Sequence, residues 1–143
     1  MPDPDLPPAP SPDAILEAGL YAEDLPAARA FYGGVLGLEE VIHVEGRHVF
    51  YRVGGSILLI FNPNATAKGT SDGKLPVPAH GAHGPGHLCF AASRKDMDAW
   101  RARLTAAGHP IESAFDWPNG AHSIYFRDPA GNSLEFAEAR LWF

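Results

Sequence analysis

Two glutamates interrupt otherwise apolar segments of this 143-residue chain, and a histidine opens a third such segment. Glu17 interrupts AILEAGLY, Glu135 interrupts SLEFAE, and His87 begins HLCFAA. A carboxylate buried without a partner is very costly, so each glutamate requires a cation or hydrogen-bond donors nearby. A neutral imidazole is a common ligand of divalent metals. A strand glutamate is more often solvated or salt-bridged than bound to a metal. These three residues therefore indicate a metal site only if the fold brings them together.

The composition is typical of a single globular domain with an acidic surface. The chain has 11 Lys and Arg against 17 Asp and Glu, and its formal net charge of -6 argues against a nucleic-acid partner. No apolar run is long enough to span a bilayer, which argues against a membrane protein. The single cysteine, Cys89, forms no intrachain disulfide and favours a cytoplasmic location.

The pattern of predicted elements divides the chain into five segments. Proline-rich residues 1–13 are expected to form a flexible arm, because proline restricts the backbone and lacks an amide donor. Residues 14–138 form the domain, with a first module at 14–61, a Gly- and Pro-rich linker at 62–86 and a second module at 87–138. Residues 139–143 are a short tail.

Each module is predicted to run strand, helix, then a pair of strands. In the first module, Asp24 caps a helix that ends at Gly37, and strands follow at 47–53 and 56–61. In the second, Ser93 caps a helix that ends at Gly108, and strands follow at 121–127 and 132–138.

The repeat is also visible in the residues themselves. GRHVFYR (46–52) parallels GAHSIYF (120–126), and LLIF (58–61) parallels SLEF (133–136). The second alignment places Ile60 at the position of Glu135. Neither half is long enough to bury both faces of its own sheet, so the two sheets are expected to pair around a shared cavity.

Two longer motifs carry a resemblance to a known family. AEDLPAARAFYGGVLGLE (22–39) and YFRDPAGNSLEF (125–136) resemble signatures of the vicinal oxygen chelate superfamily, which includes glyoxalase I, extradiol dioxygenases, fosfomycin-resistance enzymes and bleomycin-resistance proteins. The resemblance covers roughly residues 14–138. It implies an α+β fold in which two βαβββ modules form half-barrel sheets around one shared metal-binding cleft.

The resemblance also implies a set of metal ligands. The family's first ligand lies on the opening strand, here Glu17; the second opens the matching strand, here His87; the third follows the DPAGN turn, here Glu135. A fourth ligand, present in glyoxalase I, is replaced by Ile60 in our alignment. Two carboxylates and an imidazole suit Mn, Fe, Ni or Zn, and three protein ligands leave positions open for substrate. The family usually has His or Gln where this chain has Glu17.

Two further residues are candidates for catalysis. Tyr125 precedes Glu135 by ten residues, at a position that contacts substrate in the fosfomycin-resistance branch, and its hydroxyl can donate to an oxyanion. His122 can act as an acid or base. The alternatives are a packing role for Tyr125 and an exposed position on the sheet surface for His122.

The predicted function is that of a metal-dependent enzyme of the glyoxalase or dioxygenase type. Its small substrate would chelate the divalent metal through oxygen atoms, with dioxygenase or lyase/transferase chemistry. The alternative is a resistance-type protein that sequesters a small molecule without catalysis. A homodimer is expected, because family members pair modules across a two-fold axis, the linker is long enough to exchange halves, and Leu141–Phe143 is an apolar tail.

Overall fold

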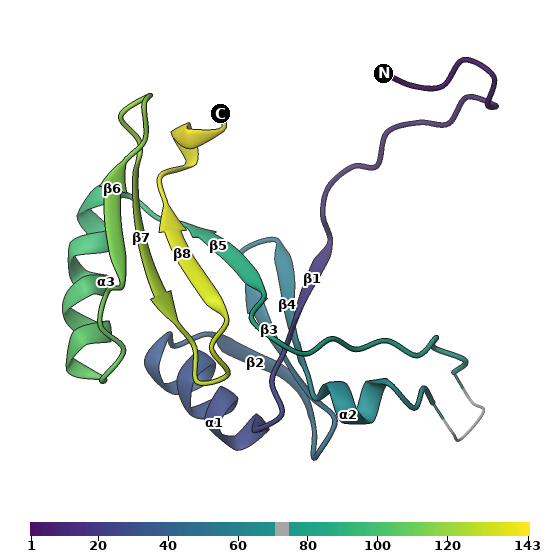
Figure 1. Cartoon of the computed structure of the whole chain (residues 1–143), viewed down its shortest axis with the longest axis horizontal. Helices are drawn as coiled ribbons and strands as arrows, with labels where there is room; N and C mark the ends of the chain where they lie inside the picture. Colours follow the sequence, from purple (N-terminus) through teal and green to yellow (C-terminus); the bar gives the residue numbers. More distant parts are fainter. Residues whose placement is uncertain (71–74) are drawn as a thin grey trace.

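Two four-stranded sheets, one from each half of the chain, form the framework of the computed structural model, which describes residues 1–70 and 75–143 (Figure 1). The strand orders are β1-β4-β3-β2 and β5-β8-β7-β6. In each sheet the first strand pairs in parallel with the last, and the remaining pairs are antiparallel. The predicted α+β fold of two βαβββ modules is confirmed, with sheets that are open rather than closed.

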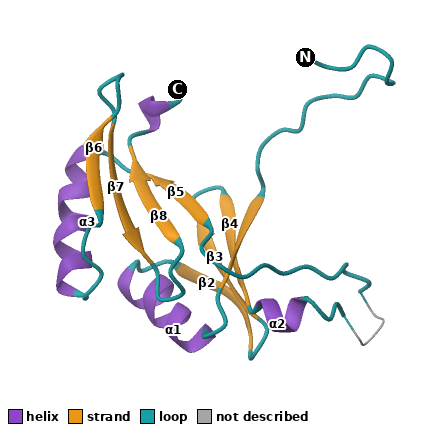
Figure 2. Ribbon diagram, in the orientation of Figure 1, coloured by secondary structure: helices purple, strands orange, loops and turns teal. Residues whose placement is uncertain are grey.

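The elements follow one another in the same order in both modules (Figure 2). The first module contains β1 (Glu17–Tyr21), α1 (Leu25–Arg29), the π-helix η1 (Ala30–Val35), β2 (Glu39–Val44), β3 (His48–Val53) and β4 (Ser56–Phe61). The second contains β5 (His87–Ala91), α3 (Arg94–Ala106), β6 (Ser113–Asp116), β7 (His122–Arg127) and β8 (Ser133–Ala137). The short helices α2 (Pro63–Thr66) and η2 (Ala139–Leu141) lie outside the modules.

Local sequence signals explain where the main helices begin. Asp24 accepts a hydrogen bond from the amide of Ala27 at 3.0 Å, and Ser93 accepts one from the amide of Asp96 at 3.1 Å. Both contacts satisfy amides that have no partner inside the helix. The predicted helices are therefore present, although the first continues from α1 into the π-helix η1.

Two strands and one helix were not identified from the residues. All residues of β2 and β6 are exposed, so neither strand has the apolar alternation that marks a half-buried strand. Within the predicted linker, Asn62 caps α2; part of that linker, residues 71–74, lies outside the described residues. Residues 1–16 contain no helix or strand, and Figure 1 shows them extending away from the sheets.

A single hydrophobic core joins the two modules. It contains residues of both sheets and of the helices that pack on them, among them Phe31, Ile60, Leu104, Phe126 and Leu134. Phe31, from η1, packs on Phe126 of the second sheet with ring centroids 6.3 Å apart. Each sheet therefore buries one face against the helices and leaves the other face open. Among the described residues, no helix is long and apolar enough to cross a membrane.

A buried polar network fastens the modules to each other. Asp128, in the turn between β7 and β8, accepts hydrogen bonds from the hydroxyl of Tyr32 at 2.6 Å and from the side-chain amide of Asn132 at 2.9 Å. Asn132 also donates to the carbonyl of Tyr21 at the end of β1 and accepts from the amide of Gly86 just before β5. Burial and the neighbouring Asp128 charge raise the pKa of Tyr32 well above its ordinary value, so its hydroxyl stays a donor.

We predict that Tyr32→Phe lowers the free energy of unfolding by about 1–3 kcal/mol, because it removes a donor from a buried carboxylate. Tyr51→Phe is the matched control. Tyr51 is equally buried, and its hydroxyl has no hydrogen-bond partner within the described part of the chain, so stability should stay the same or rise slightly. Urea titration measures both variants. Equal losses in the two variants would contradict the role given to the Tyr32 hydroxyl.

Candidate metal centre

The open face of the second sheet gathers most of the chemically capable side chains. The register pairs Tyr125 with Glu135, Cys89 with Glu135, and His87 with Ser133. Side chains of directly paired residues lie on the same face of a sheet. His87, Cys89, Tyr125 and Glu135 therefore share the open face, whereas Leu134, from the same strand as Glu135, belongs to the core.

Glu135 is almost completely buried, with 5% of its surface exposed, although it lies on the open face. Its two carboxylate oxygens have different environments. Oε2 accepts a hydrogen bond from the Ser123 hydroxyl at 2.6 Å, and Oε1 lies 3.4 Å from Nε2 of His87. Ser123 was missed from the sequence, although it precedes Tyr125 by two residues and so lies on the same face of a strand.

The hydrogen bonding of His87 fixes the orientation of its ring. Nδ1 lies 2.9 Å from the carbonyl oxygen of Ser133. A carbonyl only accepts, so Nδ1 carries a proton, and in the neutral ring Nε2 presents a lone pair toward Oε1 of Glu135. Two lone pairs facing each other at this distance need a cation or a proton between or beside them.

The donor set fits a divalent metal. In a tetrahedral site, an imidazole nitrogen and a carboxylate oxygen, each about 2.0–2.2 Å from Zn²⁺, lie about 3.4 Å apart. The distance between Nε2 of His87 and Oε1 of Glu135 is also 3.4 Å. A hydrogen bond from the second ring nitrogen to a backbone carbonyl is a common way to orient a metal-binding histidine. His87 and Glu135 can therefore hold one side of such a metal.

Aromatic side chains and a thiol surround this pair. Tyr125 stacks on His87 with ring centroids 6.2 Å apart, and Phe115 stacks on the other side of Tyr125 at 5.7 Å. Burial, followed by the charge of Glu135, raises the pKa of Tyr125 to about 12 and that of Cys89 to about 12. Both groups therefore keep their protons at neutral pH, so Tyr125 is a hydrogen-bond donor and Cys89 is a poor nucleophile.

Glu17, the first of the three predicted ligands, is not part of this cluster. Among the described residues of one chain, no group of three His, Cys, Asp or Glu side chains could hold a metal ion. Gly19 and Tyr21, on the face of β1 that carries Glu17, line a small cavity together with His87, but Glu17 is not among the residues that line it. The set of three ligands therefore stays a prediction, of which the described structure brings together His87 and Glu135.

His122, the second catalytic candidate, lies away from the pair. It precedes Ser123 on β7, so its side chain belongs to the opposite face of the sheet, and its Nδ1 lies 2.7 Å from a carboxylate oxygen of Asp116. The hydrogen bonds to His122 and then to Arg94 lower the pKa of Asp116. His122 therefore joins a surface charge cluster at the end of the sheet.

The alignment of the two modules was shifted by one residue. Glu17 pairs with Ile57 and Gly19 with Leu59, as His87 pairs with Ser133 and Cys89 with Glu135. Leu59, rather than Ile60, therefore occupies the position of Glu135. Because side chains alternate between faces, a shift of one residue moves each of them to the other side of the sheet.

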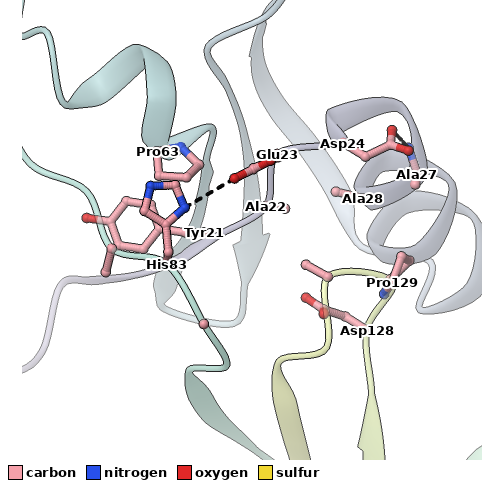
Figure 3. Close-up of a pocket in the computed structure, with 13 residues that line it drawn as sticks. Tyr21, Ala22, Glu23, Asp24, Ala27, Ala28, Pro63, His83, Asp128 and Pro129 are labelled. Carbon is pink, nitrogen blue, oxygen red and sulfur yellow. Dashed lines mark hydrogen bonds and ion pairs between the residues drawn. The ribbon is translucent and has the colours of Figure 1, made fainter.

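The linker histidines fasten the linker to the end of β1. Nδ1 of His80 lies 2.7 Å from the Tyr21 hydroxyl, and Nδ1 of His83 lies 3.1 Å from a carboxylate oxygen of Glu23. Figure 3 shows His83 and Glu23 at the edge of a pocket that also includes Asp128 and Pro129. None of the predicted metal-binding or catalytic residues lines this pocket.

Comparison with known proteins agrees with this architecture. The model of the Glyoxalase/Bleomycin resistance protein/Dioxygenase superfamily matches residues 14–136. The chain belongs to this superfamily. Its members bind small-molecule substrates, generally use a divalent metal and often form dimers. A search of curated proteins finds no match.

Solved structures of the superfamily resemble the chain closely. A lactoylglutathione lyase from Agrobacterium tumefaciens is 46% identical, with a TM-score of 0.86 over 92% of this chain and 98% of that protein. A glyoxalase/bleomycin resistance protein/dioxygenase from Nocardioides is 26% identical, with a TM-score of 0.70 over 91% of this chain and 85% of that protein. A glyoxalase family protein from Bacillus anthracis, 20% identical over 91% of this chain and 98% of that one, shows the same fold with a TM-score of 0.68.

The corrected alignment predicts opposite outcomes for two adjacent substitutions. Ile60→Glu places a charge in the core beside Leu20 and Val49, and should cost about 3 kcal/mol or more of stability. Leu59→Glu places the same charge on the open face of the first sheet, outside the shared core, and should cost less, although Leu59 is itself only 8% exposed. Thermal unfolding compares the two variants. If Ile60→Glu were as stable as the wild type, Ile60 would not lie in the core, and the original alignment of Ile60 with Glu135 would hold.

Proposed function

We propose that this protein is a metal-dependent enzyme of the glyoxalase type. In this proposal His87 and Glu135 of one chain and Glu17 of a second copy hold one divalent ion, Mn, Fe, Ni or Zn. The observation that carries the proposal is the contact between Nε2 of His87 and Oε1 of Glu135, at a distance that suits two ligands of one metal. The alternative is a proton on Nε2, which would make this contact an ion pair between His87 and Glu135 without a metal. Metal analysis of the purified protein distinguishes the metal site from the ion pair.

The placement of Glu17 supports a site shared between two copies. Glu17 is exposed on the open face of the first sheet, because it alternates with Leu20, whose side chain is in the core. Large apolar side chains are exposed on the two open faces: Ile42 and Val44 on the first sheet and Phe115 on the second. Placing the first sheet of one copy over the second sheet of another would cover them and bring Glu17 to the metal. The protein is then a homodimer with two equivalent sites.

The residues of the chain have distinct roles in this site. A bound divalent metal supplies a Lewis acid that polarises substrate oxygens. His87 and Glu135 fix the metal on the second sheet, and Ser133 orients His87. The Tyr125 hydroxyl donates a hydrogen bond to negative charge that develops on the substrate. The burial of Glu135 limits the access of water to its carboxylate.

The substrate class follows from the donor set and from the most similar structure described above. We propose a small molecule with two neighbouring oxygen atoms that bind the metal together. The Agrobacterium relative is named as a lactoylglutathione lyase, and a lactoyl group carries a hydroxyl beside a carbonyl. This favours lyase chemistry over dioxygenase chemistry. We also propose a cytoplasmic location for the protein, because a chain with a single cysteine suits a reducing compartment.

Complementation between two inactive variants tests the proposal. Glu17→Ala and Glu135→Ala should each bind metal at least tenfold more weakly than wild type and lack activity, since each removes one ligand from every site. A mixed dimer retains one complete site, formed by Glu17 of one variant and His87 and Glu135 of the other. Random mixing should therefore restore about one quarter of the wild-type sites. Metal titration and turnover of candidate substrates report the recovery.

The control for this experiment is Glu45→Ala, which removes an exposed carboxylate from the turn between β2 and β3. It should bind metal like the wild type. Absence of recovery in a mixture shown by mass spectrometry to contain mixed dimers would rule out a shared site. Metal binding without turnover of any chelating substrate would favour the sequestering protein instead.

A further inference from the structure

A chain of two hydrogen bonds connects the β6–β7 hairpin to the buried oxygen of Glu135. The indole nitrogen Nε1 of Trp117 donates to the Ser123 hydroxyl at 2.8 Å, and that hydroxyl donates to Oε2 of Glu135 at 2.6 Å. Ser123 is fully buried, and Trp117 is partly buried in the turn of the hairpin. Neither residue was identified from the sequence, and neither is needed to bring His87 and Glu135 together.

The direction of both hydrogen bonds is fixed by chemistry. An indole N–H only donates, and an ionised carboxylate only accepts. The Ser123 hydroxyl must therefore accept from Trp117 and give its single proton to Glu135. A hydroxyl whose lone pair is already used by a donor has less freedom to rotate, so its proton stays directed at Oε2. Hydrogen bonds to a charged acceptor are the stronger ones, which holds this oxygen firmly.

The other carboxylate oxygen has a different position. Oε1 faces Nε2 of His87 on the open side of the sheet, whereas Oε2 is turned toward β7. A carboxylate can bind a metal through one oxygen or through both. Binding through both oxygens requires the carboxylate to rotate until Oε2 also faces the metal beside His87, and this rotation would disturb the hydrogen bond that Oε2 accepts from the buried Ser123 hydroxyl. The hydrogen-bond chain therefore opposes two-oxygen binding.

We propose that Trp117 and Ser123 are positioning residues that restrict Glu135 to one metal-binding oxygen, Oε1. This inference rests on the metal centre proposed above. With Oε2 held away, Glu135 occupies one coordination position rather than two. The position that remains is available to the second oxygen of a chelating substrate. Trp117 and Ser123 thus preserve the capacity of the site for a ligand with two oxygen atoms, although neither touches the metal.

The experiment uses full-length protein loaded with Co²⁺, whose visible absorption depends on coordination number and geometry. Ser123→Ala releases Oε2, so its Co²⁺ spectrum should differ from that of the wild type. Its affinity for acetohydroxamate, a chelator with two oxygen donors, should fall by about tenfold or more, in the range found when a group that orients a metal ligand is removed. Trp117→Phe keeps an aromatic ring but loses the N–H, and should lower that affinity by about threefold to tenfold, the equivalent of one hydrogen bond.

Thr105→Ala is the matched control, because it also removes a side-chain hydroxyl but lies exposed on α3, on the helix side of the second sheet and away from His87 and Glu135. It should leave the spectrum and the chelator affinity unchanged. A structural role for Ser123 and Trp117 would lower stability but leave the spectrum of bound Co²⁺ as in the wild type.

Three outcomes overturn the inference. The first is wild-type spectrum and chelator affinity in a folded Ser123→Ala protein. The second applies if Ser123→Ala does not fold: a wild-type spectrum and wild-type chelator affinity in folded Trp117→Phe then overturn the inference. Failure of the wild-type protein to bind Co²⁺ removes the metal centre and this inference together, whereas Co²⁺ binding with unchanged variants removes the inference alone.

Discussion

The hydrogen bonds of Asp128 are the constraint on which the arrangement of the two modules depends. Its buried carboxylate accepts from Tyr32 in the first module and from Asn132 in the second. Asn132 in turn bonds to the backbone at the end of β1 and just before β5. A buried carboxylate needs its donors, so the modules cannot separate without exposing or orphaning these groups. The helix-covered faces consequently share one core, and the open faces are left for other partners.

This arrangement explains why the described residues of one chain bring together only two of the three predicted ligands, His87 and Glu135. His87 and Glu135 come from neighbouring strands of one sheet, so the register alone places them together. Glu17 belongs to the other sheet, whose open face does not cover them. In the proposed dimer, a second copy that offers its first sheet to this face would supply the missing carboxylate. This dimer would account for three features together: the burial of Glu135, the exposure of Glu17, and the exposed apolar side chains on both open faces.

The extent to which the sequence predicted the fold varies between elements. The helix caps Asp24 and Ser93 and the alternation of core residues identified the helices and most strands, because these signals act over a few residues. The edge strands β2 and β6 were not identified from the residues, since fully exposed strands need no alternation. The module alignment failed at Tyr51 and Ile60 because matching letters such as Tyr51 and Tyr125 do not define which face a side chain takes.

The candidate site was predicted in part for similar reasons. His87, Glu135 and Tyr125 lie on one face as the alternation of strands requires. Ser123 and Trp117 could not be recognised, because a serine and a tryptophan six residues apart gain their meaning only from the hairpin that brings them together. His122 was assigned by residue type, and its position one residue from Ser123 places it on the other face.

The most direct test of the shared metal centre is X-ray diffraction from crystals of the Zn²⁺- or Mn²⁺-loaded protein, recorded at the absorption edge of the metal. The account predicts one anomalous peak per chain, about 2.0–2.2 Å from Nε2 of His87 and Oε1 of Glu135, with Glu17 of a second copy as the third protein ligand. A peak bound to other residues, or no peak at His87 and Glu135, would contradict it.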